Sequence, residues 1–201
     1  MYNYGNALEY IAPPIFAPIV TIEYPIDNTT YIINVTALNY TTSGSSPQSC
    51  WYSLDSGATN NTLTCGNNVT GLVSVEGANT WIVYANESEG DIGSSSTTFY
   101  KDTLPPIINL TTPTNNTHTD VIQNFTATFV DGGGTDNATL YIYNSSDDLV
   151  FSQFNSFIGS PTSTELGIEY NLSIDDTYTW FYNATDIYDE TGGSQIFTII
   201  W

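Results

Sequence analysis

The feature that most constrains this chain is an internal repeat. Three residues of the segment 79–106 recur 99 positions later, in a segment with the same order of strand, acidic loop and strand. The recurring pairs are Trp81 and Trp180, Ala85 and Ala184, and Gly93 and Gly192. A chain of 201 residues is long enough for two domains of about 100 residues each. The repeat therefore predicts two modules of one fold.

Short runs of alternating apolar and polar residues fill both modules, as expected of half-buried β-strands. The expected strands include residues 31–38 and 72–75 in the first module and residues 121–130 and 166–170 in the second. About seven such strands per module, and no helical apolar stripe, predict an all-β chain of two tandem immunoglobulin-like antiparallel β-sandwiches. Trp81 and Trp180 are expected in the two cores. An exposed face that stacks on sugars is the alternative for both.

The module boundaries follow from the starts of the repeat. The first module begins at Ala17-Pro18 and the second at Pro105-Pro106, an offset of 88 rather than 99 residues. The second module therefore holds about eleven more residues, expected near residues 151–164. Prolines near the N-terminus exclude a helix there. The predicted parts are an extended N-terminal segment at residues 1–16, which is either a tail or a donor strand, and sandwich domains at residues 17–102 and 103–201.

Four segments resemble the tandem immunoglobulin-like or fibronectin-III-like repeats of archaeal and bacterial cell-surface proteins. They are PPIINLTTPTNNT, WYSLDSG, WIVYANESEGDIG and WFYNATDIYDETGG. The resemblance covers residues 17–201 and implies two β-sandwiches in a cell-surface protein. Its motifs are structural, so it implies no particular activity.

Acidic side chains dominate the charge of the chain. There are 21 Asp and Glu against a single cation, Lys101, which gives a formal net charge of −20. Such a chain repels nucleic acids and anionic membranes, so neither is an expected partner. No apolar run reaches the roughly 20 residues of a membrane span. Residues 1–20 also lack the basic start and unbroken apolar stretch of a secretory signal.

Cys50 and Cys65 are the only cysteines, and a turn signal at residues 55–57 lies midway between them. A hairpin folded at this turn places the two cysteines directly opposite each other in an antiparallel ladder. The Cα atoms of such a pair lie about 4.5–5.5 Å apart, a distance that a disulfide bridges. We predict a Cys50–Cys65 disulfide, with two reduced, buried cysteines as the alternative. A disulfide favours an extracellular setting.

Asn-x-Ser/Thr, the acceptor motif for N-glycosylation, is more frequent than composition explains. Thirteen of the 20 asparagines carry it, whereas the Ser and Thr content predicts about five by chance. The acceptor positions are Asn28, Asn34, Asn39, Asn60, Asn68, Asn86, Asn109, Asn115, Asn124, Asn137, Asn144, Asn171 and Asn183. We predict covalent N-glycans at several of them. Strand alternation and Asn-rich turns are the alternative source of the pattern.

Acidic residues also gather in loops of the second module. The groups are residues 131–136, 147–148, 175–176, and Asp186 with Asp189 and Glu190. Loops between sandwich strands can supply the roughly six to eight oxygens that Ca²⁺ needs, and Asp186, Asp189 and Glu190 are predicted to form a weak Ca²⁺ site. Solvated turn aspartates are the alternative. No other cofactor is expected. The single histidine, His118, gives no support for a catalytic arrangement, so we expect no enzyme.

These features predict a non-enzymatic structural subunit of an extracellular surface assembly, such as a filament, pilus or layer, archaeal and glycosylated. Self-association into a homopolymer is expected by β-strand addition, in which the N-terminal segment of one copy pairs with a sheet edge of the next. The expected subunit contacts are Leu8, Tyr10, Ile11, Ile15 and Phe16. Two alternatives stay open. One is a virion structural protein, such as a capsid decoration or tail-associated protein, and the other is an adhesin fragment that binds a glycan or host protein.

Overall fold

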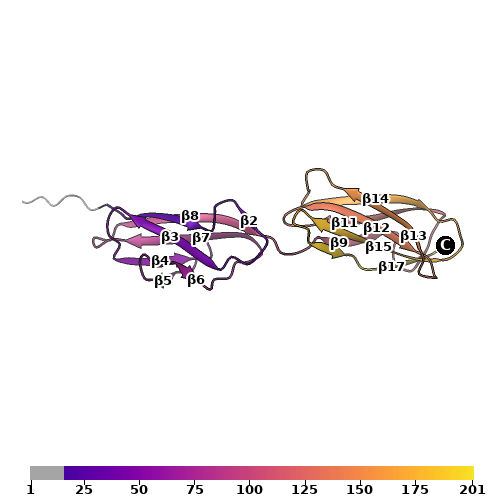
Figure 1. Ribbon diagram of the computed structural model, residues 1–201. Coiled ribbons are helices and arrows are strands. Elements are labelled where there is room, and N and C mark those ends of the chain that lie inside the picture. The colour runs from indigo at the N-terminus through magenta and orange to yellow at the C-terminus, as the bar shows by residue number, and fades with distance from the viewer. Residues whose placement is uncertain (1–15) are drawn as a thin grey trace, which may run out of the picture. The chain divides into compact units, whose positions relative to one another are not determined.

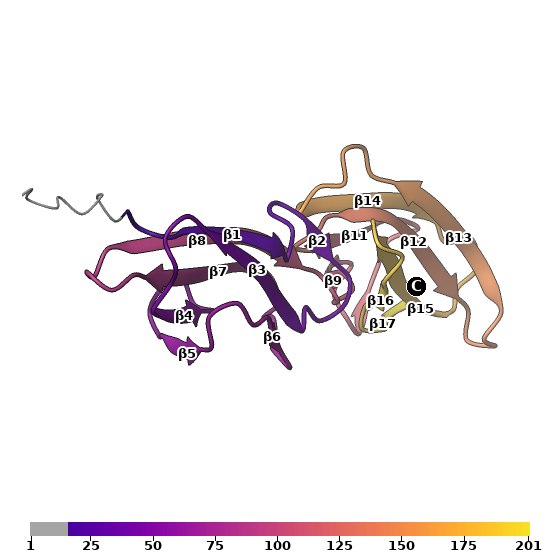
Figure 2. The ribbon, with the colours of Figure 1, turned by 60° about the vertical axis from the view of Figure 1, so that its left-hand side comes forward.

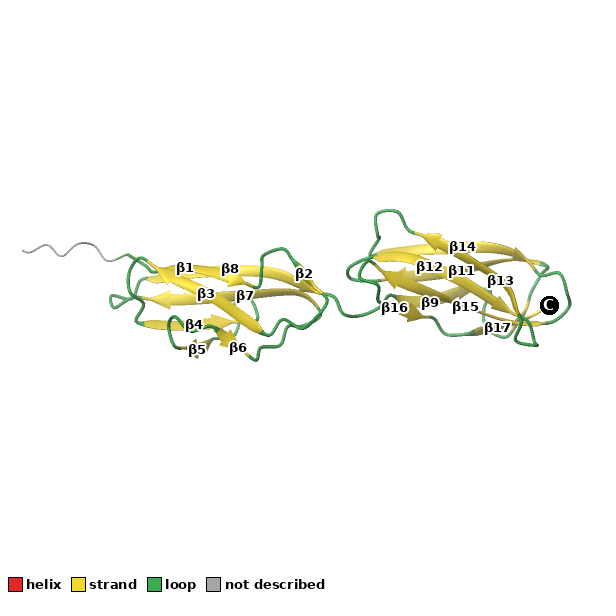
Figure 3. Ribbon diagram, in the orientation of Figure 1, coloured by secondary structure: helices red, strands yellow, loops and turns green. Residues whose placement is uncertain are grey.

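The computed structural model describes residues 16–201, and all regular structure in that range is β-strand (Figure 3). The strands fall into two compact units, with the boundary between Lys101 and Asp102. Asp102 therefore belongs to the second unit, although the sequence placed it at the end of the first domain. Each unit consists of two sheets packed around its own apolar core (Figure 1). The prediction of two tandem β-sandwiches is confirmed.

Unit 1 contains a three-stranded sheet in the order β1-β3-β6 and a five-stranded sheet in the order β2-β8-β7-β4-β5. Neighbouring strands are antiparallel except β2 and β8, which are parallel. The strands are β1 (Ile19–Tyr24), β2 (Thr30–Tyr31), β3 (Ala37–Ser43), β4 (Ser49–Ser53), β5 (Asn61–Leu63), β6 (Val69–Thr70), β7 (Gly77–Asn86) and β8 (Ile92–Lys101).

Unit 2 contains a three-stranded sheet in the order β14-β11-β9 and a larger sheet in the order β10-β17-β15-β12-β13, with β16 also paired to β15. The strands are β9 (Ile107–Thr112), β10 (Thr117–His118), β11 (Ile122–Val130), β12 (Thr135–Tyr143), β13 (Leu149–Ser156), β14 (Ser163–Asn171), β15 (Thr177–Asp186), β16 (Thr191–Gly193) and β17 (Phe197–Ile200). The extra residues of this unit lie between β12 and β15. There β13 and β14 have eight and nine residues, against three and two in β5 and β6.

A fully buried tryptophan lies at the centre of each core. Trp81 of β7 meets Phe99 edge-on, with ring centroids 4.9 Å apart, and Trp180 of β15 meets Phe125 in the same way at 5.2 Å. Alternate side chains of these central strands point between the two sheets, which places both indoles in the core. The core prediction is confirmed for both tryptophans. An exposed sugar-stacking role for them is wrong.

The predicted strand at residues 31–38 is wrong, because the chain crosses from one sheet to the other there. Tyr31 pairs with β8 in the larger sheet, and the next strand begins only at Ala37, in the smaller sheet. Asn34 lies in the crossing and bonds through its side chain. Its Oδ1 accepts a hydrogen bond from the Ser74 N–H at 2.8 Å.

The predicted strand at residues 72–75 is wrong for a related reason. The Leu72 N–H donates to the Thr36 carbonyl at 3.0 Å, and the rest of this backbone bonds to side chains rather than to a neighbouring strand. The Leu72 carbonyl accepts a hydrogen bond from Asn34 Nδ2 at 3.3 Å, and the Val75 N–H donates to Asn79 Oδ1 at 2.9 Å. Asparagine amides mimic the donor and acceptor of a strand and so replace the ladder.

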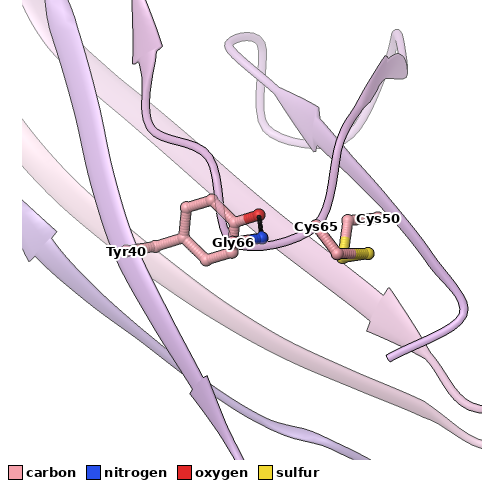
Figure 4. The surroundings of a disulfide bond; sticks show 4 residues. All are labelled: Tyr40, Cys50, Cys65 and Gly66. Carbon is pink, nitrogen blue, oxygen red and sulfur yellow. Dashed lines mark hydrogen bonds between the residues drawn. A yellow bond between two sulfur atoms is a disulfide. The ribbon is translucent and has the colours of Figure 1, made fainter. Parts of the chain in front are cut away.

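The predicted disulfide joins Cys50 and Cys65, whose Cα atoms are 5.2 Å apart (Figure 4). The predicted register is wrong by two residues, because Cys50 faces Leu63 across the β4–β5 ladder and Cys65 lies just beyond β5. Tyr40, on β3 of the other sheet, holds the chain at this point. Its hydroxyl accepts a hydrogen bond from the Gly66 N–H at 2.9 Å, as Figure 4 shows.

Candidate metal centre

Three buried aspartates meet at one end of unit 2. Asp102 lies before β9, Asp131 follows β11, and Asp186 is the last residue of β15. One carboxylate oxygen of each lies within 4.8 Å of the other two, and the residues are only 7%, 6% and 1% exposed. Because β9 and β15 run antiparallel to β11 and β12 respectively, these strand ends share one end of the sandwich. The fold, rather than a local motif, therefore brings the three carboxylates together.

Asp186 is held by the loop that follows β15. Its Oδ1 accepts hydrogen bonds from the backbone N–H groups of Tyr188 and Glu190, both at 2.8 Å. Its Oδ2 is buried and has no hydrogen-bond partner among the described residues. Thr135 lies directly opposite in the β12–β15 ladder, and its buried hydroxyl also has no partner within residues 16–201. Buried polar atoms are normally paired, so two unpaired oxygens on one rung need an explanation.

Asp131 is fixed by the glycine loop between β11 and β12. Its Oδ1 accepts hydrogen bonds from the N–H groups of Gly133 and Gly134, at 2.9 and 2.8 Å. Gly134 has φ +109°, and a Cβ there would collide with the Ser160 carbonyl, so the turn requires glycine. The Gly134 carbonyl accepts a hydrogen bond from the Ile187 N–H at 3.3 Å. This bond connects the Asp131 loop to the Asp186 loop.

Gly133 makes room for the third carboxylate. A Cβ at this position would collide with Asp102 Oδ2 and would lie 3.0 Å from the Tyr188 ring. The Asp102 carboxylate thus lies against the backbone of the same loop that orients Asp131. An alanine at position 133 would force Asp102 out of its place.

No lysine or arginine of unit 2 offsets the charge of this cluster. The only such residue in the chain is Lys101, and its Nζ pairs with Glu76 of unit 1 at 3.4 Å. Unit 2 itself contains 13 Asp and Glu and neither Lys nor Arg. Carboxylates buried this close repel one another unless a proton or a cation lies between them. Chemically, the cluster offers a cation three hard oxygen ligands.

Of the three residues predicted to bind Ca²⁺, only Asp186 belongs to the cluster. Asp189 is exposed and Glu190 is half-buried, and the Glu190 backbone serves to orient Asp186. Asp131 carried a sequence signal, because it opens an acidic, glycine-rich loop. Asp102 carried none, because it is a lone aspartate next to a predicted domain boundary.

None of the thirteen acceptor asparagines is buried. Seven are exposed, namely Asn28, Asn60, Asn68, Asn109, Asn115, Asn124 and Asn171, and six are half-buried, namely Asn34, Asn39, Asn86, Asn137, Asn144 and Asn183. The buried asparagine of the described chain, Asn79, lacks the acceptor motif. Among the predicted subunit contacts, Phe16 is 71% exposed. Leu8, Tyr10, Ile11 and Ile15 lie outside the described residues.

His118 lines an open hollow at the opposite end of unit 2. The hollow is formed by Thr112, Pro113, Thr114, Thr117, His118, Thr119, Asp120 and Gln123. Four threonines and Asp120 lie beside the imidazole in this lining. Its polar surface offers no apolar platform for a ligand.

Solved structures with two immunoglobulin-like domains resemble this chain. The D00-D0 domain of Intimin has a TM-score of 0.54 at 8% identity and covers 92% of this chain and 100% of its own. DIP-gamma IG1+IG2 has a TM-score of 0.54 at 9% identity and covers 90% and 97%. The fibronectin(III)-like modules of Clostridium thermocellum CbhA have a TM-score of 0.35 at 18% identity and cover 90% and 92%. The two structures with a TM-score of 0.54 share the fold of this chain, so the resemblance to tandem immunoglobulin-like repeats is confirmed.

No protein-family model matches the chain, and no curated protein does. Within residues 16–201 there is no helix with the length and apolar character needed to cross a membrane.

Proposed function

We propose that this protein is a non-enzymatic structural subunit of an extracellular surface assembly, in which copies are joined by β-strand addition. The observation that carries the proposal is the open edge of β13 in unit 2. Within residues 16–201 this strand is the last of the larger sheet and pairs only with β12 (Figure 2). Its eight residues include no charged residue and no proline. Charged residues and prolines are the usual means by which edge strands avoid pairing. The edge is therefore suited to accept another strand.

The exposed side chains of β13 favour an apolar partner strand. Leu149 and Phe154 are 50% and 63% exposed. Residues 8–15 match β13 in length and carry Leu8, Ile11 and Ile15. Pairing with this segment of another copy would satisfy the open backbone groups of β13 and cover its apolar side chains.

Two changes test this mode of assembly. Deletion of residues 1–16 should abolish polymers in negative-stain micrographs and leave the circular dichroism spectrum unchanged. Phe154→Lys should have the same effect, because a lysine on an edge strand opposes pairing. Tyr100→Lys is the matched control, since Tyr100 is an exposed aromatic residue but pairs with Thr30 of β2 on one side and Ala78 of β7 on the other. Polymers that survive both the deletion and Phe154→Lys would contradict the proposal.

We propose further that the assembled subunits are N-glycosylated. Exposed acceptors such as Asn28, Asn60, Asn109, Asn124 and Asn171 can carry a glycan without burial of the sugar. Half-buried Asn34 is a poorer acceptor, because its amide nitrogen already donates to the Leu72 carbonyl. Native material should exceed 22.0 kDa by hexose-sized increments. A native mass equal to that of the bare chain contradicts this part of the proposal.

An adhesin is the second candidate, favoured by stacked aromatic rings on the larger sheets. Trp51 and Tyr84 stack across β4 and β7, with centroids 5.4 Å apart, and Tyr141 and Phe181 stack across β12 and β15 at 5.2 Å. All four are half-buried and alternate with core residues, so they lie on the outer faces of the sheets. Such rings offer flat apolar contact to a ligand. A glycan array with the full chain tests this role, and Trp51→Ala should remove any binding that depends on the unit 1 pair.

A further inference from the structure

We infer that unit 2 binds one Ca²⁺ ion through Asp102, Asp131 and Asp186. The site is independent of the proposed assembly, because it lies at the end of unit 2 where β9 begins and not on the β13 edge. Three carboxylates meet in a buried space, and unit 2 contains no lysine or arginine to offset them. A bound divalent cation would neutralise most of this charge without any rearrangement of the fold.

The spacing and chemistry of the oxygens fit Ca²⁺. Oxygens bound to one Ca²⁺ at about 2.3–2.6 Å lie up to about 5 Å apart, and the three carboxylates offer oxygens within 4.8 Å of one another. Carboxylates are hard ligands, whereas zinc prefers the thiolate and imidazole ligands that this cluster lacks. Mg²⁺ demands a nearly regular octahedron at about 2.0–2.1 Å. Ca²⁺ accepts irregular ligand sets completed by water, which suits three side chains from separate loops.

The bonding of Asp186 points to a ligand independently of the charge. Asp186 is 1% exposed, and both N–H bonds of its loop go to Oδ1. These bonds fix the carboxylate and leave Oδ2 with no donor among the described residues. The unpaired hydroxyl of Thr135 lies on the same rung of the ladder, on the same face of the sheet. A cation supplies what a buried, rigidly held carboxylate oxygen lacks.

Shared protons are the competing way to neutralise such a cluster. Protonated carboxylic acids would leave the folded chain indifferent to Ca²⁺ at neutral pH. A Ca²⁺ site instead gains stability from the ion, because the ion binds the folded state alone. Binding measurements on the wild-type chain therefore separate the two explanations.

Isothermal titration of the metal-free, full-length chain with CaCl₂ at neutral pH tests the site. We expect one ion per chain, with a dissociation constant of roughly 10⁻⁵ to 10⁻³ M, and a higher melting temperature for unit 2 in CaCl₂ than in EDTA. Asp186→Asn and Asp131→Asn keep the Oδ1 acceptors of their loops and should still fold. Each should weaken binding by about tenfold or more. Gly133→Ala keeps all three carboxylates but displaces that of Asp102, and it should weaken binding as well.

Asp189→Asn is the matched control, because it removes an exposed carboxylate from the loop that holds Asp186. It should leave Ca²⁺ affinity unchanged. The inference is overturned if the folded wild-type chain shows no saturable Ca²⁺ binding, or if MgCl₂ produces the same rise in melting temperature. It is also overturned if Asp189→Asn weakens binding as much as Asp186→Asn does.

Discussion

The same end of the sandwich is built differently in the two units. Glu87 of unit 1 stands 99 residues before Asp186 and, like it, opens the loop after the tryptophan strand. Its Oε2 accepts a hydrogen bond from the Glu89 N–H at 2.7 Å and its Oε1 one from the Asp91 N–H at 2.9 Å. Both oxygens of Glu87 are thus satisfied by its own loop. Asp186, one methylene shorter, takes both N–H bonds on a single oxygen.

The neighbouring positions differ as well. At the end of β3, unit 1 has Ser43 and Gly44 where unit 2 has Asp131 after β11. Unit 1 instead carries the disulfide. The repeat thus specifies the core and the strand order, and each unit stabilises its loops by different chemistry. A closed carboxylate loop and a covalent bridge serve unit 1, and we infer a bound cation in unit 2.

Loss of a core tryptophan should have the largest effect on stability. It should also show the consequence of the difference that unit 1 has a disulfide and unit 2 has none. Replacing a buried tryptophan by alanine costs about 3–5 kcal/mol of unfolding free energy. Trp180→Ala should therefore unfold unit 2 at ambient temperature. Trp81→Ala should leave unit 1 weakened but still cross-linked by its disulfide. Calorimetry of the full chain, with one transition assigned to each unit, measures both changes. Equal tolerance of the two substitutions would contradict a stabilising role for the bridge.

Removal of the disulfide should come next in size. Closure of a loop of 15 residues stabilises a fold by about 3 kcal/mol, so the double change Cys50→Ala and Cys65→Ala should lower the stability of unit 1 by that order. Urea unfolding followed by tryptophan fluorescence measures the loss. Unit 2 serves as the internal control, since it has no cysteine. A matched fall in unit 2 would mean that the two units do not unfold independently.

Neutralising the equivalent carboxylates Glu87 and Asp186 should have opposite effects on the melting temperatures of their units in EDTA. Glu87→Gln should lower the melting temperature of unit 1, because the new amide can accept only one of the two loop hydrogen bonds. Asp186→Asn should stabilise metal-free unit 2 by about 1 kcal/mol, because it removes charge repulsion and adds a donor. Differential scanning calorimetry gives both signs. A fall in the melting temperature of unit 2 in Asp186→Asn would contradict our account of the cluster.

Acid should have the smallest effect on stability. In unit 1 this effect should come from the protonation of Asp55. The Thr59 hydroxyl, followed by that of Ser53, lowers the pKa of Asp55 to about 2, and hydrogen bonds led by the Glu89 N–H lower the pKa of Glu87. A folded pKa below the unfolded value adds stability above about pH 4. That stability should disappear as the pH falls from about 4 towards 2. Across this pH range the melting temperature of unit 1 should fall less for Asp55→Asn than for the wild type.

The sequence was sufficient for the parts of the fold that rest on periodicity. Trp81 and Trp180 lie on long strands where side chains alternate between core and surface, so their burial could be predicted. The disulfide could also be predicted, although the register of the hairpin around it could not. Ser53 accepts hydrogen bonds from the Asp55 and Gly57 N–H groups, which shapes the turn and shifts the pairing by two residues.

The candidate metal site could be predicted from the sequence only in part, because it depends on contacts between distant segments. Asp186 and Asp131 stand in acidic loops that a sequence can display. Asp102 joins them because β9 runs antiparallel to β11, a pairing that no local pattern reveals. Asn34 shows the same limit in unit 1. Its side chain replaces strand pairing for residues 72–74, and the alternation of those residues gives no sign of this.

Lys101 gives the chain a further property. With one lysine and no arginine, the protein offers trypsin a single target bond, between Lys101 and Asp102, which is also the boundary between the units. That lysine ends β8 and pairs with Glu76, and the residue after it belongs to the carboxylate cluster. Proteolysis there would divide the chain into its two sandwiches in one step. The rate of that cut should fall in the presence of calcium, because Asp102 must leave the cluster before the bond can enter a protease.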